Sequence, residues 1–427
     1  MSTHTHAEII SRDSEAILAP AFVEFVKWVL KSAGEQNIRR IYFLARDGYP
    51  MYRAAQILSR GREPEIECRY LRCSRYSLRI PSFHLIGKEA AEQICLGGID
   101  VTLEKVLKRA ALTDEEAGEI AGLLGRQKEM DRILSYGEVQ MLKRELLDME
   151  KFWEYVNIHA GEAYDAAAGY LKAEGLMDAV RWAVADSGWT GSMQMTLRIL
   201  LESAGYRGRL TGYYFGLYHI PEGEKKENYH AYYFEPFGKI KRKVHFSNSL
   251  FECMFSEPEQ MTLGYKETSG GYEPVREPGE VKNKEALEII ADAVEKEAQK
   301  EALELPDCLH LWQILDPDVI QRKMADLMSR PDKEQAQAFG NLWFNDDVRG
   351  EGQKIAVPLT EEEIRNSHVL PRGASMTGIR KEPVKESAWM EGSIVLGGKR
   401  IRWHLWQNRM YKYILYIKKQ IMEKRKK

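Results

Sequence analysis

The sequence contains the order buried strand, glycine turn and helix twice, and this repetition constrains the fold more than any other feature. The first copy runs from an apolar strand over 39–45 through a glycine turn to a helix over 51–58. The second has an apolar run at 182–185, a turn that begins at Asp186 and a helix that stops at Gly205. Strands that alternate with helices are typical of a mainly parallel sheet. The sequence therefore predicts a Rossmann-like α/β core, with both turns at one edge of its sheet.

The second turn has the composition of a phosphate site. Its segment 187–192 places two glycines among small hydroxyl residues directly before a helix. Backbone N–H groups and the positive end of the helix dipole attract anions at such a position. Asp186, at the end of the strand, can accept hydrogen bonds from sugar hydroxyls or help to hold hydrated Mg²⁺. This pattern predicts a sugar-phosphate site, and the alternative is an ordinary turn with a Ser or Thr N-cap.

Three further polar residues are candidates for chemistry. A predicted strand over 66–73 brings Arg72 and Arg75 to or just beyond a strand end, where a guanidinium can bind phosphate bidentately. The alternative for each is a solvated edge residue. Glu252 lies among apolar residues, so its carboxyl can have a raised pKa and take part in proton transfer. Its alternative is the paired acid of a helix.

The remaining segments predict a core of residues 1–268 with a helical insertion at about 99–177. We expect a helix over 13–34 with Ser14 as its cap, a strand over 209–218 and further strand structure over 228–247. The insertion could be a lid and acceptor platform or plain structural embellishment. Its predicted helices lie near 102–107, 115–124, 138–155 and 159–173.

Beyond the core, a Gly/Glu/Pro-rich connector is expected at 269–279, and helices at 284–343 form most of a C-terminal region at 280–390. The span 346–392 is polar and irregular. The last 37 residues, 391–427, form a basic tail.

The tail is charged differently from the rest of the chain. Residues 399–427 contain eleven Lys or Arg and one Glu, a net charge of +10, whereas the whole chain has −2. A helix from Ile401 would place its aromatic and aliphatic residues on one stripe, namely Trp403, Trp406, Met410, Tyr413, Ile414, Ile417 and Ile421. Such a helix can lie in an anionic membrane surface. The alternative is that the aromatic face packs on the protein's own body.

Cysteine use and hydropathy indicate the compartment. The five cysteines include no CxxC pair, so neither a disulfide framework nor a zinc site is supported, and reduced cytosolic thiols are the default. No run approaches a membrane-spanning length, and the N-terminus lacks the order of a signal peptide. We expect a cytoplasmic protein whose tail can contact the inner face of the cell membrane. The acidic body shows no nucleic-acid-binding motif, so no nucleic-acid partner is predicted.

Taken together, segments 41–58 and 184–201 resemble the type I phosphoribosyltransferase fold. That fold has an early strand, turn and helix that receive pyrophosphate, and a later strand, acid and Thr-Gly turn that receive a ribose 5-phosphate. Here Ser187 replaces the second acid of the later motif, and Thr190-Gly191 follows Asp186 one residue sooner. This departure affects how the ribose 2′- and 3′-hydroxyls are held, but not the phosphate site.

The segments FLARDG (43–48) and DSGWTGS (186–192) also resemble bacterial polysaccharide phosphoribosyltransferases, over roughly residues 10–265. The resemblance implies transfer of 5-phosphoribosyl from phosphoribosyl pyrophosphate to a lipid-linked glycan, with release of pyrophosphate and inversion to a β-ribofuranoside 5-phosphate. Mg²⁺, held through ligand oxygens and water rather than directly by the protein, is the implied cofactor. A separate phosphatase of the haloacid dehalogenase superfamily is the implied partner.

The resemblance assigns roles to individual residues. Arg46, Asp47 and Gly48 would meet the pyrophosphate, and chemistry extends this set to Arg72 and Arg75. The acceptor proton would pass to Asp186, Asp47 or Glu252. The ribose 5-phosphate would be held by Asp186, Ser187, Gly188, Thr190, Gly191, Ser192 and Met193.

Two other functions remain as alternatives. The chain could be a phosphate-ligand-binding module without catalysis, because fold does not fix function. It could also be a haloacid dehalogenase-like phosphatase, which needs an Asp nucleophile and a second Asp two residues later at a strand end. The one DxD, Asp316-Pro317-Asp318, lies in a helical context with Ile320 where a Thr is expected, and Asp346-Asp347 completes no ordered set. The phosphatase is therefore disfavoured.

Overall fold

The computed structural model describes residues 5–98, 100–345, 352–376, 385 and 387–425. Its centre is a sheet of five parallel strands in the order β2-β1-β3-β4-β5. This confirms the predicted α/β core with a mainly parallel sheet. The strands are β1 (Arg40–Leu44), β2 (Glu67–Leu71), β3 (Trp182–Trp189), β4 (Thr211–Leu217) and β5 (Tyr229–Phe234).

The order of the strands places a topological switch point between β1 and β3. These two strands are neighbours, but the chain leaves β1 toward β2 on one side and leaves β3 toward β4 on the other. In open α/β sheets the crevice at such a point, outside the carboxyl ends of the strands, is where ligands bind. Both predicted turns follow the strands that flank it.

Alternate strand residues pack against two different helical layers, as the period of two requires. Ile41 and Phe43 of β1 share a core with α2 (Ala19–Glu35), α3 (Gly48–Ser59) and α13 (Lys284–Glu304). Tyr42 and Leu44 point to the other face, where they meet α4 (Arg75–Ile86), α9 (Glu150–Ala173) and α10 (Ser192–Ser203). The C-terminal helix α13 therefore belongs to the same core as the N-terminal helices.

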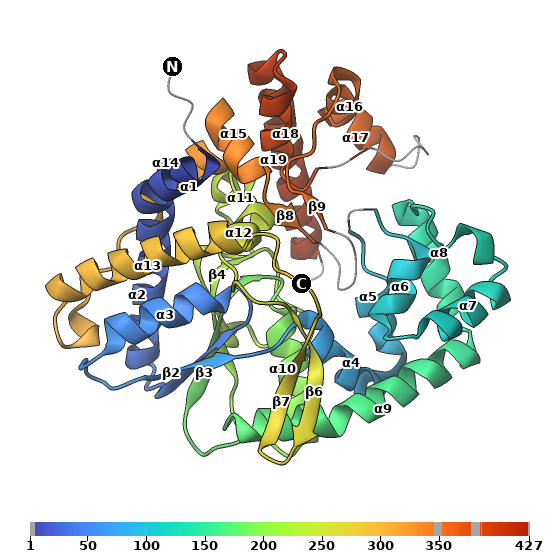
Figure 1. Cartoon of the computed structure of the whole chain (residues 1–427), viewed down its shortest axis with the longest axis horizontal. Coiled ribbons are helices and arrows are strands. Elements are labelled where there is room, and N and C mark those ends of the chain that lie inside the picture. The colour runs from blue at the N-terminus through green and yellow to red at the C-terminus, as the bar shows by residue number, and fades with distance from the viewer. Residues whose placement is uncertain (1–4, 99, 346–351, 377–384, 386, 426–427) are drawn as a thin grey trace.

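The helical insertion has a core of its own and lies at the far end of α9 from the sheet (Figure 1). The helices after α4 are α5 (Ala91–Ile94), α6 (Leu103–Arg109), α7 (Asp114–Leu123) and α8 (Tyr136–Leu147). The predicted helical character is confirmed, but two boundaries were wrong. Helical structure already begins at Arg75, and the break expected near 156–158 falls at Asp148 and Met149 instead.

The expected connector at 269–279 is largely a β-hairpin. Strands β6 (Thr262–Thr268) and β7 (Gly271–Arg276) pair antiparallel across the two-residue loop Ser269-Gly270. Glycines that look like a linker in the sequence form the tight turn that such a hairpin needs. The hairpin packs on α9, where the rings of Tyr265 and Tyr170 stack with centroids 4.3 Å apart.

Two other predicted boundaries were wrong. The first helix, α1 (His6–Asp13), starts at the cap Thr5, which forms a capping box with Glu8. Ser14 is not a cap; it opens a π-helical turn and donates to the carbonyl of Ile10. Strand β5 ends at Phe234, because the chain then forms the short helix α11 (Ile240–Val244).

The C-terminal region is helical, as predicted for 284–343. The prediction of irregular structure over 346–392 was wrong for part of its described residues, which form helices at 361–366, at 369–376 and from 390. Within these described ranges, no helix combines the length and apolar composition needed to cross a membrane. The remaining elements are α12 (Asn248–Met254), α14 (Pro317–Ser329), α15 (Lys333–Gly340), β8 (Trp343–Phe344), β9 (Gln353–Lys354), α16 (Glu361–Asn366), α17 (Val369–Met376), α18 (Met390–Gly397) and α19 (Ile401–Arg425).

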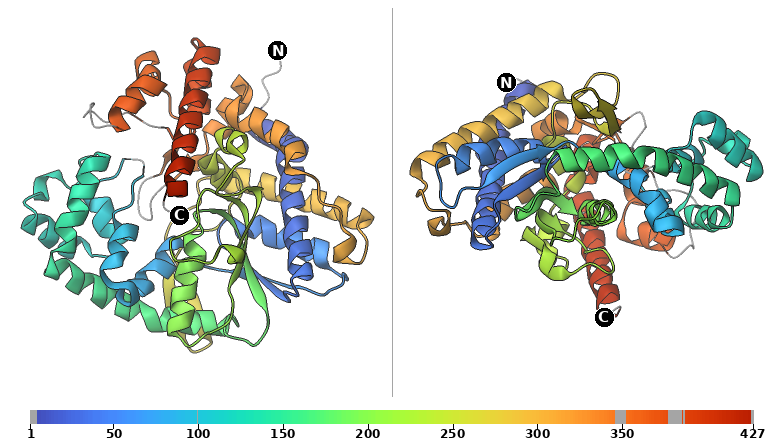
Figure 2. Two further views of the ribbon diagram at one scale, coloured as in Figure 1. Left: turned by 180° about the vertical axis from the view of Figure 1, so that it is seen from behind. Right: turned by 90° about the horizontal axis from the view of Figure 1, so that it is seen from below.

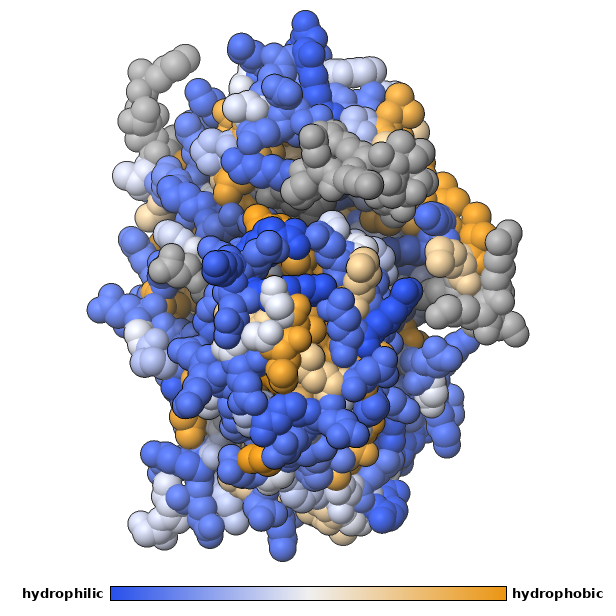
Figure 3. All heavy atoms as spheres, turned by 90° about the vertical axis from the view of Figure 1, so that its right-hand side faces the viewer, coloured by the Kyte–Doolittle hydropathy of each residue, from blue (hydrophilic) through white to orange (hydrophobic). Residues whose placement is uncertain are grey.

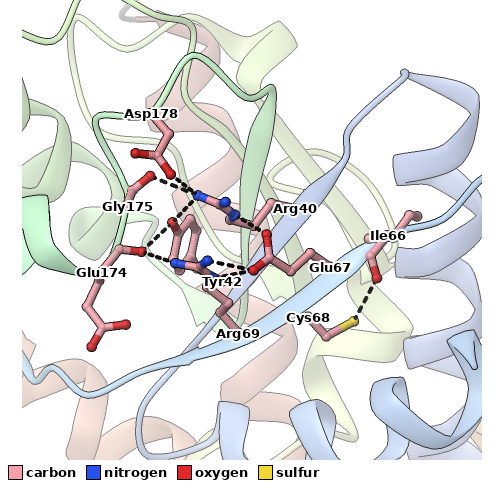
Figure 4. Close-up of polar contacts among 9 residues, drawn as sticks. All are labelled: Arg40, Tyr42, Ile66, Glu67, Cys68, Arg69, Glu174, Gly175 and Asp178. Carbon is pink, nitrogen blue, oxygen red and sulfur yellow. Dashed lines mark hydrogen bonds and ion pairs between the residues drawn. The ribbon is translucent and has the colours of Figure 1, made fainter.

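A network of charged residues closes the amino edge of the sheet (Figure 4). Arg40 of β1 forms ion pairs with Glu67 of β2 and with Asp178, and its Nη1 donates to the carbonyl of Gly175 at 3.0 Å. Arg69 donates to the carbonyl of Glu174. Helix α9 ends at Ala173, so these bonds satisfy carbonyls just past its end and fasten the insertion to the sheet.

Candidate functional site

A cavity of about 480 Å³ lies at the carboxyl edge of the sheet, at the switch point between β1 and β3. Arg46 of the first turn and Thr190 of the second both line it, so the two turns share one cavity. Its other walls come from α4, α12 and the helical insertion, which contributes Gln93, Leu96 and Arg109. The insertion therefore forms part of the site's enclosure.

The first turn brings a charged pair to the cavity. Arg46 and Asp47 line it directly after β1, and the Ala45–Arg46 peptide bond is cis. Gly48 begins α3 at a point where a Cβ atom would lie 2.8 Å from the backbone carbon of Phe43. Only glycine fits there without displacing the strand, so Gly48 shapes the turn and does not line the cavity.

The second turn is shorter than predicted, because β3 continues through Trp189. Gly188 pairs with Gly216 of β4, and a Cβ atom on Gly188 would lie 2.4 Å from the Gly216 carbonyl oxygen. The glycine therefore extends the strand and does not end it. The turn is Thr190-Gly191, and Gly191 has the left-handed φ of 64° directly before α10.

The N-terminus of α10 presents hydroxyl groups to the cavity. Thr190, Ser192 and Met193 line it, and the Thr190 hydroxyl donates to the Ser192 hydroxyl at 3.1 Å. Arg79 of α4 reaches the same Ser192 hydroxyl through its Nη2 at 3.4 Å. A helix N-terminus, two hydroxyls and a guanidinium thus converge on one place, as an anion site requires.

Arg79 is one of three cavity-lining arginines on the insertion side, with Arg75 and Arg109. Its Nε is buried without a hydrogen-bond partner, and within the described part of the chain no ion pair involves Arg79. Burial, helped by the charges of Arg75 and Arg109, lowers the pKa of Arg79 to about 9. The group still carries its charge at neutral pH. A partly buried cation without an ion-pair partner is costly, so this position suits an anionic ligand.

Three carboxyl groups also line the cavity: Asp47, Asp186 and Glu252. Burial raises the pKa of Asp186 to about 7; the N–H groups of Ser187 and Gly188 oppose this rise, and the charge of Glu252 adds to it. Burial also raises the pKa of Asp47 well above its usual value, with further contributions from Glu252 and Asp186. A carboxyl that titrates near neutral pH can accept a proton during a reaction.

Neighbouring side chains orient these carboxyls. The Ser187 hydroxyl donates to Asp47, which ties β3 to the first turn across the switch point. The indole N–H of Trp189 donates to Glu252 at 2.7 Å. Trp189 is itself fixed by aromatic packing against Phe246 and Phe251. Glu252 is therefore a hydrogen-bonded residue of α12 that lines the cavity. The alternative from the sequence was that it served only as the paired acid of a helix.

A hydrated magnesium ion fits beside the carboxyls that line the cavity. Among the residues that the structure describes, no group of three or more His, Cys, Asp or Glu is arranged to hold a metal ion by itself. Mg²⁺ needs few protein ligands when it binds substrate oxygens and keeps its waters. Asp47 and Asp186 are close enough for their charges to raise the pKa of Asp47, and a cation beside them would relieve this repulsion.

The two arginines predicted to bind pyrophosphate, Arg72 and Arg75, lie in different surroundings. Arg75 lines the cavity, but Arg72 does not: its guanidinium lies 5.6 Å from the centroid of the Tyr70 ring and 3.8 Å from Glu259. The prediction from sequence missed several lining residues, namely Arg79, Gln93, Arg109, His219, Asn248 and Asn345. Arg79 could have been found, since it follows Arg75 by four residues in the helix that Ser74 caps.

The acidic pairs considered for a phosphatase lie elsewhere. Asp316 caps α14 by accepting from the Asp318 N–H, and both carboxylates pair with Arg242. These contacts give the DxD a structural role at a helix start. The pair Asp346-Asp347 lies outside the described residues.

Comparisons with known proteins leave the family open. A scan against protein-family models finds no model that matches the chain, and a search of curated proteins finds no match either. The residues that line the cavity, and the charges they bring together, are therefore the basis for assigning a function.

Proposed function

We propose that the chain is a phosphoribosyltransferase of the type I fold that transfers 5-phosphoribosyl from phosphoribosyl pyrophosphate to a lipid-linked polysaccharide acceptor. One observation carries the proposal. Two turns with the composition of anion sites line the same cavity, which is also lined by arginines and by three carboxyls. A ribose with phosphate groups at both ends matches this arrangement of charge.

Each end of the ligand has a proposed place. The 5-phosphate binds at the N-terminus of α10, with Thr190, Ser192 and Arg79 as donors. The diphosphate binds at the first turn near Arg46, with Mg²⁺ supplying further neutralisation when bound. Asp186 lies on β3 and accepts hydrogen bonds from the ribose hydroxyls. It does so without a second acid, because Ser187 stands where the resembled motif has one.

The reaction is a substitution at the anomeric carbon. The bond from C1 to the diphosphate oxygen breaks with its electron pair on pyrophosphate, and a bond from the acceptor oxygen to C1 forms on the opposite face. The result is a β-ribofuranoside 5-phosphate. The acceptor proton passes to a carboxylate, and we assign this role first to Asp186 because its pKa of about 7 suits a base at neutral pH.

The helical insertion is the proposed acceptor platform. Gln93 and Arg109 bring polar groups from it into the cavity, and Leu96 adds an apolar contact. A sugar acceptor needs such a mixture of hydrogen-bond donors and apolar surface. A separate phosphatase would then remove the 5-phosphate from the product.

The experiment is an assay of purified protein with Mg²⁺, phosphoribosyl pyrophosphate and a lipid-linked glycan acceptor. We expect release of pyrophosphate that depends on acceptor, together with labelling of the glycan by radioactive ribose. Binding of phosphoribosyl pyrophosphate without turnover over a panel of acceptors would favour the alternative, a phosphate-ligand-binding module. Absence of both binding and turnover would reject the proposal.

A further inference from the structure

The C-terminal helix α19 carries a continuous apolar stripe on its outer surface. Trp403 is 51% exposed, Ile414 49% and Ile421 48%, and the side chains between them at the same spacing are also exposed: Trp406, Met410 and Ile417. Successive members are three or four residues apart, so they share one face of the helix over about 27 Å. Six large apolar side chains in one row are unusual on a surface and indicate contact with an apolar phase or a partner.

The opposite face of α19 fixes the helix to the body. Leu405 and Asn408 are buried, Lys412 pairs with Glu391 of α18, and the ring of Tyr416 stacks on Tyr218 with centroids 5.5 Å apart. The alternative in which the aromatic face packs on the body is therefore wrong. The helix has a satisfied inner face and an apolar outer face, and its C-terminal end projects from the molecule (Figure 2).

The positive charge around the stripe indicates what kind of partner binds it. The segment 399–427 carries a net charge of +10, and Arg402, Lys418 and Lys419 are exposed on α19 itself. Two copies of so basic a helix would repel each other when their stripes met. An anionic lipid surface offers both an apolar phase for the stripe and negative charge for its flanks.

We propose that α19 docks the protein on an anionic membrane surface, with the stripe Trp403, Trp406, Met410, Ile414, Ile417 and Ile421 inserted at the level of the lipid headgroups. The helix lies in the plane of the surface and the body stays in water. This inference does not depend on the reaction proposed above.

The test is sedimentation of the full chain with vesicles of phosphatidylcholine, with or without phosphatidylglycerol. We expect binding only when phosphatidylglycerol is present, and at least a ten-fold lower partition coefficient for the combined variant Ile414→Gln, Ile417→Gln and Ile421→Gln. Brominated acyl chains should quench tryptophan fluorescence of the parent chain, and Trp403→Phe with Trp406→Phe should remove most of that quenching.

A matched control comes from the helical insertion, whose side of the molecule shows apolar areas within a largely hydrophilic surface (Figure 3). Leu123, Ile133 and Met141 are exposed there by 61%, 44% and 55%. Changing these three to Gln removes as much exposed apolar surface and should leave vesicle binding unchanged. Because all six positions are exposed, both variants should keep the melting temperature of the parent chain.

Three results would overturn the proposal. The parent chain could remain unbound with anionic vesicles, or the α19 variant could bind as well as the parent. A dimer in sedimentation velocity that the α19 substitutions dissociate, without vesicle binding, would assign the stripe to a second copy. The vesicles contain neither glycan nor phosphoribosyl pyrophosphate, so failure here leaves the proposed reaction untouched.

Discussion

The two edges of the central sheet both collect charged residues, but the pKa values of their carboxyls shift in opposite directions. At the amino edge, Arg40 has two carboxylate partners and a carbonyl (Figure 4). Burial tends to raise the pKa of Glu67, but the hydrogen bonds from Arg40 and Arg69 hold this pKa below its usual value. At the carboxyl edge the pKa values of Asp47 and Asp186 are raised, and Arg79 keeps a buried Nε without a partner.

This contrast teaches how to separate structural charge from functional charge in one fold. Charges that pair with each other stabilise the position of strands and helices. Carboxyls that are crowded together in a cavity keep raised pKa values, and a buried guanidinium Nε without a hydrogen-bond partner has a donor left for a ligand. The carboxyl edge therefore has the electrostatic character of a binding site, and the amino edge has that of a fastening for α9.

The largest expected effect is at Asp186. We predict that Asp186→Asn lowers kcat for pyrophosphate release by about 10³-fold, because the amide cannot accept the acceptor proton. In the parent protein we expect kcat to rise with pH through the pKa of about 7, as the carboxyl ionises. An unchanged pH profile in a partly active Asp186→Asn enzyme would assign the base to Asp47 or Glu252.

The same substitution should stabilise the fold at alkaline pH. The folded-state pKa of Asp186 lies above the unfolded value of about 4, so the folded protein holds this proton more tightly and loses stability as pH rises from 4 to 7. Asn removes this loss. We expect a gain of roughly 1–2 kcal/mol at pH 8, discounted for water in the cavity, and none at pH 4. Denaturant titration of the parent chain and the variant at both pH values measures this difference in unfolding free energy.

Arg79 comes next in size. We predict that Arg79→Ala lowers kcat/KM for phosphoribosyl pyrophosphate by about 100-fold, as expected for one or two lost charged hydrogen bonds, without lowering stability. Arg72→Ala is the matched control, because Arg72 lies outside the cavity and should change kcat/KM less than about two-fold. Equal losses in the two variants would contradict the distinction between them.

A substitution at the amino edge should lower stability and leave the kinetics nearly unchanged, which is the reverse of the effect expected for Arg79→Ala. Arg40→Ala removes both ion pairs and the bond to the Gly175 carbonyl, so we expect a loss of about 2 kcal/mol in unfolding free energy. The kinetics of the folded protein should stay within about two-fold of the parent, since the edge is remote from the cavity. Chemical denaturation and steady-state kinetics on the same preparation make this comparison.

The smallest effect is expected at Trp189. Trp189→Phe keeps most of the aromatic packing but removes the 2.7 Å hydrogen bond to Glu252. We predict a loss of roughly ten-fold or less in kcat, about the value of one hydrogen bond. A shift in the pH profile would show that Trp189 acts by positioning Glu252; loss of stability alone would indicate a packing role.

The sheet could be predicted well from the sequence, because buried strands produce short apolar runs. The runs at 39–45, 66–73, 182–185 and 209–218 correspond to β1 to β4. Glycines caused two of the errors: Gly188 lies inside β3, and the glycines near 270 form a hairpin turn. Their role depends on which backbone lies opposite, and a single sequence does not contain that information.

The candidate site was predicted in part for a similar reason. Asp47 follows β1 and Asp186 lies in the carboxyl half of β3, so their meeting near one sheet edge follows from parallel topology. Arg79 and Arg109 come from helices of the insertion, and only the packing of α4 and α6 brings them to the cavity. Arg72 and Arg75 looked equivalent in the sequence, but the start of α4 at Arg75 turns one into the cavity and leaves the other beside Tyr70.

The most direct test of the central claim, that the carboxyl edge is a site for a ligand with two anionic ends, is calorimetric titration with phosphoribosyl pyrophosphate and Mg²⁺. The account predicts one site per chain with micromolar affinity, weakened about 100-fold by Arg79→Ala and unchanged by Arg69→Ala at the amino edge. Absence of binding by the parent chain, or equal weakening by the two substitutions, would contradict it.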